Sequence, residues 1–254
     1  PAAALPLPPH ATVRVGNETE QSLAAIARAW GSRPEQAEAI ASKAEGSPLF
    51  ARLAAGLCQA GVLTPAKLPT GIAALQRYWW EKMDATGRQL AMLLAASAAP
   101  LAPELLAEIA GTPLRTVERW LQRWEPFFEL VDDQAQLYHP ATRAFVRAQR
   151  DDDLAEAHGA FVRFVQKQAG DHFAGALDSA HRPLLDALAR HAALATPAIS
   201  AAALPVLATR SWAVARERQS GTLRDAASDI AWVLRASAGG DLLRLVRHAT
   251  LAGV

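Results

Sequence analysis

Histidine has a pKa suited to proton transfer near neutral pH, and its ring nitrogens bind metal ions. The chain contains seven histidines. His181 and His191 are ten residues apart, so a single helix would place them on different faces. His158 and His172 have no carboxylate or cysteine partner at a spacing typical of metal ligands. The pattern therefore predicts surface histidines or hydrogen-bonded core histidines, and no metal centre.

The sequence lacks the short motifs of several common catalytic sites. Neither H-E-x-x-H nor G-x-S-x-G occurs, and no Gly-Lys pair is present to complete a phosphate-binding loop G-x-x-x-x-G-K-[ST]. The segment Phe127–Asp133 has the form of an apolar strand that ends in magnesium-binding acids. A second strand pattern follows at once, which instead favours a hairpin turn at Asp132 and Asp133. We expect no catalytic residue and no self-contained nucleotide hydrolysis.

Three arginines could contact an anion together. Arg115, Arg119 and Arg123 recur every four residues in a helical pattern, so one helix face would present all three. The preceding helix, expected at 103–110, ends at Gly111, and such a tight turn between two helices is typical of a helix-turn-helix. DNA binding through these arginines is therefore one hypothesis.

The composition of this second helix favours a structural role instead. Glu118 and Glu125 lie among the arginines, and Trp120 and Trp124 require burial. Gln122 alone supplies an amide side chain of the kind that reads base edges. We therefore favour a solvated arginine face on a structural helix over a DNA-reading helix.

The elements that position these residues are predicted to be almost all helical. Apolar residues recur at three- and four-residue spacing, and Gly and Pro separate the segments. A weak strand pattern at 11–15 precedes a helix capped by Asn17 or Thr19, and a hairpin is expected at 127–131 and 136–138. Further helices are expected at 34–43, 49–60, 89–98, 103–110, 112–125, 141–150, 174–192, 200–208, 210–218, 222–235 and 241–252.

These elements predict a mainly α fold in three parts. Residues 1–66 would form a linker and a small helical domain. Residues 67–150 have the order helix, short helix, helix, hairpin, which is that of a winged-helix domain with one β-hairpin. Residues 151–254 would form a helical array, in which no fixed repeat period is clear.

Composition limits the class of protein. The 254 residues are 51% hydrophobic and 20% charged, which is ordinary for a globular protein, and the net charge of +1 creates no strong field for nucleic acid or anionic membranes. The single cysteine, Cys58, excludes an internal disulfide, and no apolar run approaches the ~20 residues that span a bilayer. We expect a soluble, cytoplasmic fragment of a longer chain, with no membrane partner.

Two short signatures resemble those of one superfamily. Ala44-Glu-Gly-Ser-Pro-Leu-Phe-Ala-Arg-Leu53 resembles the G-x-P signature of the small helical domain that follows the nucleotide-binding core of STAND proteins. These are the signal-transduction NTPases that include apoptotic ATPases, plant resistance proteins and NACHT proteins. Leu137-Tyr-His-Pro140 is similar to the histidine element that ends their winged-helix domain, and the segments 68–72 and 78–80 look like its lead-in. The resemblance covers about residues 5–165.

The resemblance implies nucleotide-binding roles for three residues. Gly46 and Pro48 would lie against the adenine, and His139 would reach the terminal phosphate of ADP and hold an inactive, closed state. The helix expected after His139 would add its positive end toward an anion. The histidine lies between Tyr138 and Pro140 here, which departs from the Met-His-Asp form of apoptotic and plant members.

The resemblance also implies partners and a cofactor. An upstream NTPase core domain would hold ADP or ATP with Mg²⁺ in the full-length parent, and residues 1–66 would be its helical lid. Exchange for ATP would release the His139 contact and drive assembly of a homo-oligomer. A protein or small ligand would trigger the switch on the C-terminal helices, in bacterial defence or regulatory signalling.

Two alternatives stay open. One is a transcriptional regulator whose winged helix binds DNA through the three arginines. The other is a helical scaffold that binds a protein partner after Gly170, with Trp212 and Trp232 as candidate anchors. We favour core positions for both tryptophans over exposed anchor positions.

Overall fold

The computed structural model describes residues 18–170, 182–221 and 224–237. This part of the chain is mainly α-helical and holds one two-stranded antiparallel hairpin, which confirms the predicted fold class. The chain forms two compact units, Pro1–Glu81 and Lys82–Val254. The strand pattern at 11–15 and the helix expected at 241–252 lie outside the described residues.

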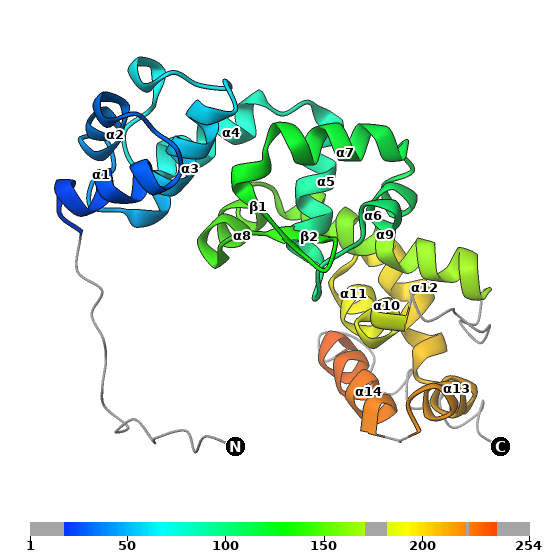
Figure 1. Ribbon diagram of the computed structural model, residues 1–254. Helices are drawn as coiled ribbons and strands as arrows, with labels where there is room; N and C mark the ends of the chain where they lie inside the picture. The colour runs from blue at the N-terminus through cyan, green and yellow to red at the C-terminus, as the bar shows by residue number, and fades with distance from the viewer. Residues whose placement is uncertain (1–17, 171–181, 222–223, 238–254) are drawn as a thin grey trace, which may run out of the picture. The chain divides into compact units, whose positions relative to one another are not determined.

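The first unit is a small helical bundle in which α1 packs against α2 and α3 (Figure 1). Leu23, Ile40, Phe50, Leu53 and Leu57 are fully buried in its core. Their burial from three separate helices is what holds this unit together. Its elements are α1 (Glu20–Ala29), α2 (Pro34–Ala41), α3 (Pro48–Gln59), the 3₁₀ turn η1 (Pro65–Lys67) and α4 (Ile72–Lys82), whose last residue enters the second unit.

Local capping sets where these helices begin. The Thr19 hydroxyl accepts a hydrogen bond from the Ser22 N–H, so Thr19 and not Asn17 is the N-cap of α1. The Ser47 hydroxyl likewise accepts from the Phe50 N–H at the start of α3. Pro48 occupies the first helical position, where its missing N–H leaves no bond unmade.

The second unit begins with three helices and a hairpin. These are α5 (Ala85–Ala96), α6 (Pro103–Ala110), α7 (Leu114–Arg123), the 3₁₀ turn η2 (Glu125–Phe127), β1 (Phe128–Val131) and β2 (Gln134–Leu137). Leu101, between α5 and α6, bridges Ala135 in antiparallel fashion. The strand order is therefore β1, β2, Leu101, and the sequence of elements is that of a winged helix.

The hairpin turn uses only two residues. Asp132 and Asp133 have φ of 50° and 61°, which matches a tight two-residue hairpin loop. Val131 therefore pairs with Gln134 and Phe128 with Leu137. The expected second strand, 136–138, is corrected to Gln134–Leu137, because a loop this short lets pairing resume at once.

Three predicted helix starts are wrong by two or more residues, including that of the helix expected at 200–208, which begins at Pro197. α5 begins at Ala85 and not at 89, because the Asp84 carboxylate accepts a hydrogen bond from the Gly87 N–H. Thr112 does not cap α7. Pro113 occupies the N-cap position without a side-chain bond, and α7 begins at Leu114.

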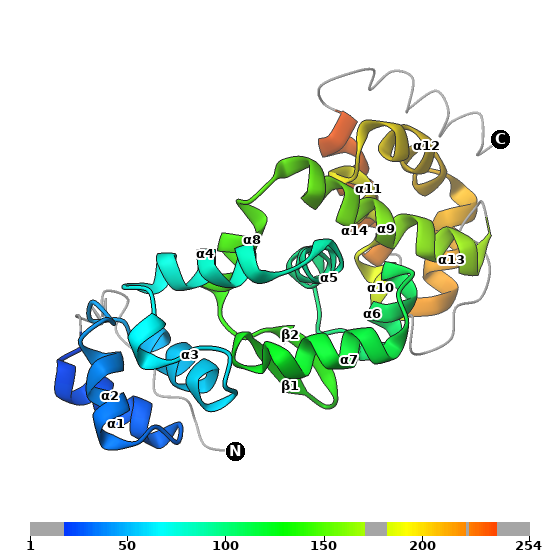
Figure 2. The same ribbon diagram turned by 90° about the horizontal axis from the view of Figure 1, so that it is seen from above.

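The rest of the second unit is helical. Its elements are α8 (Pro140–Arg147), α9 (Asp151–Ala169), α10 (Arg182–Asp186), α11 (Leu188–Leu194), α12 (Pro197–Leu207), α13 (Arg210–Ser220) and α14 (Arg224–Ser237). The long α9 packs between α5 and α11 (Figure 2). The described part of the helix expected at 174–192 is broken at Ala187 and continues to Leu194.

A helix that crosses a bilayer needs about 20 consecutive, predominantly apolar residues. No single helix in the described ranges meets both requirements, although the bent pair Pro197–Leu207 and Arg210–Ser220 meets them jointly.

Candidate functional site

The turn before α3 holds the first two predicted nucleotide contacts. Glu45 and Gly46 both have positive φ, 50° and 77°, and the Ser47 N–H donates to the Ala44 carbonyl at 2.8 Å. This tight reversal places Pro48 at the first position of α3. Gly46 and Pro48 are both half-buried, so each keeps some surface for a ligand.

A lysine beside this turn was not identified from the sequence. The Lys43 ammonium donates to the carbonyls of Pro65, Ala66 and Leu68 at 3.0, 3.3 and 2.8 Å. The Lys43 carbonyl in turn accepts from the Gly71 N–H at 2.8 Å. Lys43 therefore fixes the connector that follows α3, and its three donors are used within the protein.

His139 is the N-cap of α8. Its Nδ1 accepts a hydrogen bond from the Ala141 N–H at 3.1 Å, so in the neutral ring the proton resides on Nε2. His139 is half-buried, and its ring lies 6.3 Å from that of Tyr138. The arrangement leaves an Nε2–H donor beside the positive start of a helix, which can bind an anion.

Gly46 and Pro48 belong to the first unit and His139 to the second. Their convergence on one nucleotide thus stays a prediction. In residues 18–170, 182–221 and 224–237, no three His, Cys, Asp or Glu side chains are grouped so that they could hold a metal ion.

Helix α7 presents its three arginines to solvent. Arg115, Arg119 and Arg123 are all exposed, while Val117 and Trp120 on the opposite face are buried. Two of the arginines make local contacts. The Arg119 Nε donates to the Arg115 carbonyl at 3.2 Å, and the Arg123 guanidinium lies 5.3 Å from the Trp124 ring centre.

The other flank of α7 is acidic. A groove of about 640 Å³ lies between α6, α7 and the hairpin, with Phe128, Leu121 and Leu130 as its apolar lining. We call it the acidic groove, because four carboxylates line it: Glu104, Glu118, Glu125 and Asp133. A DNA phosphate approaching the arginines of α7 would also meet this acidic flank.

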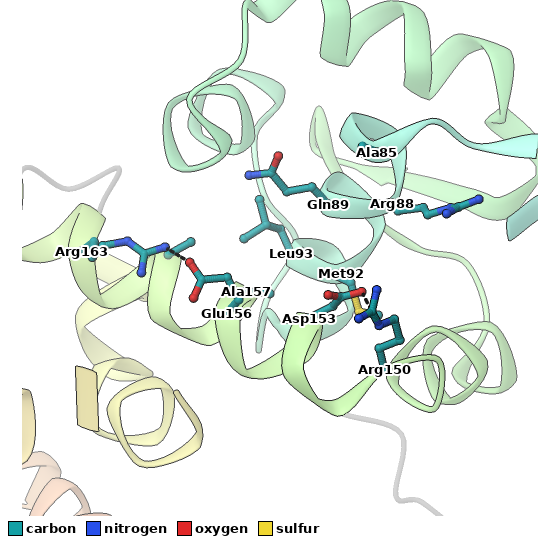
Figure 3. Close-up of a pocket in the computed structure, with 11 residues that line it drawn as sticks. Ala85, Arg88, Gln89, Met92, Leu93, Arg150, Asp153, Glu156, Ala157 and Arg163 are labelled. Atoms are coloured by element: carbon teal, nitrogen blue, oxygen red, sulfur yellow. Dashed lines mark hydrogen bonds and ion pairs between the residues drawn. The ribbon is translucent and has the colours of Figure 1, made fainter. Parts of the chain in front are cut away.

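A second cleft, of about 350 Å³, lies between α5 and α9 (Figure 3). Met92 and Leu93 supply its apolar side. Arg150, the N-cap of α9, lies 3.6 Å from Asp153, and Arg163 on α9 forms an ion pair with Glu156.

Both wall carboxylates of this cleft, Asp153 and Glu156, are thus already paired with guanidinium groups on the same stretch of chain. The cleft is therefore a weaker candidate for recognition of a charged ligand than the acidic groove.

Two histidines from distant helices form a buried pair. The Nδ1 atoms of His158 on α9 and His191 on α11 lie 2.8 Å apart, and the side chains are 3% and 1% exposed. The Phe161 ring stacks on His191 with centroids 4.2 Å apart. The prediction of a hydrogen-bonded core histidine holds for both, while His172 and His181 lie outside the described residues.

Burial holds this pair in its neutral form. Burial lowers the pKa of His158 to about 4, and the positive charges of Arg190 and Arg147 act in the same direction. Burial likewise lowers the pKa of His191 well below its ordinary value, assisted by His158 and Arg190. A neutral, hydrogen-bonded pair of this kind is structural.

Trp212 is a core residue and not a partner anchor. It is 1% exposed, and its indole N–H donates to the Asp229 carboxylate at 3.1 Å. The same carboxylate oxygen accepts from the Arg216 Nε at 3.0 Å, and the Arg216 Nη1 donates to Asp186 at 3.0 Å. Burial is the main influence on the Asp229 carboxyl and raises its pKa to about 6, against the opposing effects of Arg216 and Trp212.

Trp232, the second candidate anchor, is half-buried. Its ring centre lies 5.6 Å from the Arg235 guanidinium. Trp232 therefore does not expose a full ring face to a partner protein.

Comparisons with known proteins identify no relative of this chain. No protein-family model, no curated protein and no solved structure matches the chain.

Proposed function

We propose that this chain is the regulatory segment of a nucleotide-dependent STAND-type signalling switch. In this proposal His139 contacts the terminal phosphate of ADP or ATP, and Gly46 and Pro48 contact the base. The nucleotide and its Mg²⁺ are held mostly by a separate core domain in a cytoplasmic, homo-oligomerising parent.

The single observation that carries the proposal is the hydrogen bond from the Ala141 N–H to the His139 Nδ1. This bond fixes the neutral tautomer in which Nε2 carries the proton. A donor fixed in this way, at the positive end of α8, suits a phosphate oxygen better than a free imidazole would.

Two further features support the proposal. The Gly46–Ser47–Pro48 turn opens a helix with a proline at its first position, and this half-buried ring supplies apolar atoms against which a base can pack. The order of elements also agrees with the superfamily, since a small helical unit is followed by a winged-helix arrangement whose hairpin leads into His139.

The first test is the coding sequence upstream of Pro1. The proposal requires a phosphate-binding loop of the form G-x-x-x-x-G-K-[ST] within the same protein, because this chain contains none. A complete coding sequence without such a loop would overturn it.

The second test separates phosphate contact from helix capping in the protein that carries both parts. His139→Ala removes the Nδ1 cap and the Nε2–H donor, whereas His139→Asp keeps a good N-cap but places a negative charge at the phosphate. We expect both variants to release ADP faster and only His139→Ala to lose about 1 kcal/mol of stability. Unchanged ADP retention in His139→Asp would contradict the phosphate role.

A further inference from the structure

The acidic groove borders a strand edge with unused hydrogen-bonding groups. In the described residues β2 has neighbours on both sides, namely β1 and Leu101, whereas β1 pairs only with β2. The Leu101 N–H and C=O bond to Ala135 at 3.0 and 2.7 Å, so the backbone groups of Ala135 point away from β1. An edge strand of this type is a template for pairing with another chain.

Leu130 is the residue at this edge. It is the cross-strand partner of Ala135, whose backbone is already directed to Leu101, so this is a non-hydrogen-bonded pair. The N–H and C=O of Leu130 therefore point out of the free edge. Within the part of the chain that the structure describes, neither group has a backbone partner.

The Leu130 side chain is exposed beside these groups. It is 63% exposed, the highest value among the large apolar side chains described. Phe128, two residues earlier on the same face of β1, is buried and lines the groove. Leu130 thus extends the apolar surface of Phe128 outward toward solvent.

The charge around this surface has one sign. Glu104, Glu118, Glu125 and Asp133 line the groove, and none of the described residues lining it is a lysine or an arginine. Four carboxylates around an apolar strip attract cations and repel phosphates, so a nucleic acid or an anionic membrane does not fit.

We propose that the acidic groove and the free edge of β1 bind an extended, lysine- or arginine-rich segment of a partner protein. The segment adds to β1 as a further strand and hydrogen-bonds to the Leu130 backbone. On the face of this strand that meets the groove, an apolar side chain packs on Phe128 and Leu130, and the cations two residues before and after it face Glu118 and Glu125. This inference is independent of nucleotide binding and of His139.

The test uses a synthetic hexapeptide, acetyl-Thr-Lys-Thr-Leu-Thr-Lys-amide, in which the lysines and the leucine share one face of an extended strand, with this chain. We expect saturable binding at low salt, with slowed hydrogen exchange and a shifted NMR signal of the Leu130 amide. The peptide with glutamate in place of lysine should not bind. The same peptide with the backbone nitrogens of its lysines and leucine methylated should bind at least about tenfold more weakly, because it lacks strand-pairing donors on one edge.

Charge reversals on the protein provide matched controls. The double variant Glu118→Lys/Glu125→Lys should weaken binding about tenfold or more. Glu129→Lys reverses a single charge on the opposite face of β1, where Glu129 accepts a hydrogen bond from Gln136 at 2.9 Å. It should alter binding less than about threefold.

Several outcomes would overturn the inference. No peptide binding at millimolar concentration would mean that the carboxylates only protect the strand edge from aggregation. Equal losses in Glu129→Lys and in the groove variant would indicate nonspecific charge attraction. Full binding of the methylated peptide would exclude strand addition, and competition by duplex DNA would contradict the proposed class of partner.

Discussion

The Nδ1 atoms of His158 and His191, 33 residues apart in the sequence, lie 2.8 Å apart in the interior of the second unit. Only one proton fits between them, so one ring donates and the other accepts. The positive charge near this pair and α8 comes from Arg190, Arg147 and Arg143. Two imidazolium ions could not occupy this position together.

The pair predicts a loss of stability in acid. Its folded-state pKa values lie below the ordinary histidine value, at about 4 for His158, so the unfolded chain binds more protons between pH 6.5 and 4. Above pH 6.5, protonation of His158 and His191 should not change the free energy of unfolding. It should fall as the pH decreases from 6.5 toward 4, by on the order of 2–3 kcal/mol. Urea unfolding at half-unit pH steps measures it.

The Asp229 carboxyl changes the free energy of unfolding with pH in the opposite direction, so its contribution must be separated from that of the two histidines. Its pKa is raised to about 6, so the unfolded chain binds fewer protons than the folded chain between pH 6 and 4, and this group stabilises the fold as the pH falls. The double variant His158→Leu/His191→Leu removes both histidines without leaving one unpaired. In this double variant the fall in the free energy of unfolding between pH 6.5 and 4 should disappear. An unchanged pH slope in that variant would assign the loss to other groups.

A second prediction concerns the buried ion pair of Arg216 and Asp229, whose side chains are 2% and 3% exposed. Arg216→Ala would leave the Asp229 carboxylate buried, with the Trp212 indole N–H at 3.1 Å as its remaining side-chain donor among the described residues. We expect a loss of about 3–5 kcal/mol in the free energy of unfolding. Urea denaturation monitored by tryptophan fluorescence would measure it.

Arg163→Ala is the matched control, because Arg163 and Glu156 form an ion pair whose side chains are 50% and 56% exposed. It should lose less than about 1 kcal/mol. Similar losses of unfolding free energy in Arg216→Ala and Arg163→Ala would mean that burial does not determine how much each ion pair stabilises the fold.

Local chemistry explains which parts of the fold could be predicted from the sequence. Ser47, Pro48 and Pro140 act on the next few residues, so their helix starts could be placed without knowledge of the tertiary structure. The Asp132–Asp133 turn was predictable for the same reason. The break at Ala187 was not, because neither glycine nor proline occurs there.

Long-range contacts explain what was missed at the candidate sites. The partner of His158 lies on another helix, and the three carbonyls that Lys43 binds belong to a connector beyond α3. No spacing rule relates such residues. The acidic groove was missed for the same reason, since its carboxylates come from α6, α7, η2 and the hairpin turn and gather only in the fold.

A third prediction tests DNA binding by α7. If Arg115, Arg119 and Arg123 contacted three phosphates, the logarithm of the association constant would fall with the logarithm of salt concentration with a slope of about −2.7. We expect no such dependence, because Glu118 lies on the same helix and lines the acidic groove. Fluorescence anisotropy with labelled duplex DNA at 50 and 200 mM salt would measure it.

The triple variant Arg115→Gln/Arg119→Gln/Arg123→Gln provides the comparison. It should bind duplex DNA as weakly as the unaltered chain. Clear binding by the unaltered chain, lost in the triple variant together with the salt slope, would restore the DNA-binding hypothesis.

A final prediction concerns the close approach of Gly87 on α5 to the Trp120 ring on α7. An alanine in place of a helical glycine usually stabilises a helix by about 0.5–1 kcal/mol. At Gly87, however, an added Cβ would lie 2.8 Å from the Trp120 Nε1. Trp120 is 8% exposed, and its ring packs against Phe128 with centroids 4.6 Å apart, so the indole cannot easily move. We therefore expect Gly87→Ala to destabilise the protein by about 1–3 kcal/mol, as measured by thermal and urea unfolding.

A double-mutant cycle can assign this loss to the clash. Trp120→Phe removes the Nε1 atom that the new Cβ would meet and leaves a ring to pack on Phe128. Gly87→Ala should therefore cost at least about 1 kcal/mol less in the Trp120→Phe background than in the unaltered chain, because neighbouring substitutions that relieve one another are not additive. Strictly additive losses would mean that the Cβ disturbs something else, such as the 2.7 Å bond from the Gly87 N–H to Asp84 that begins α5.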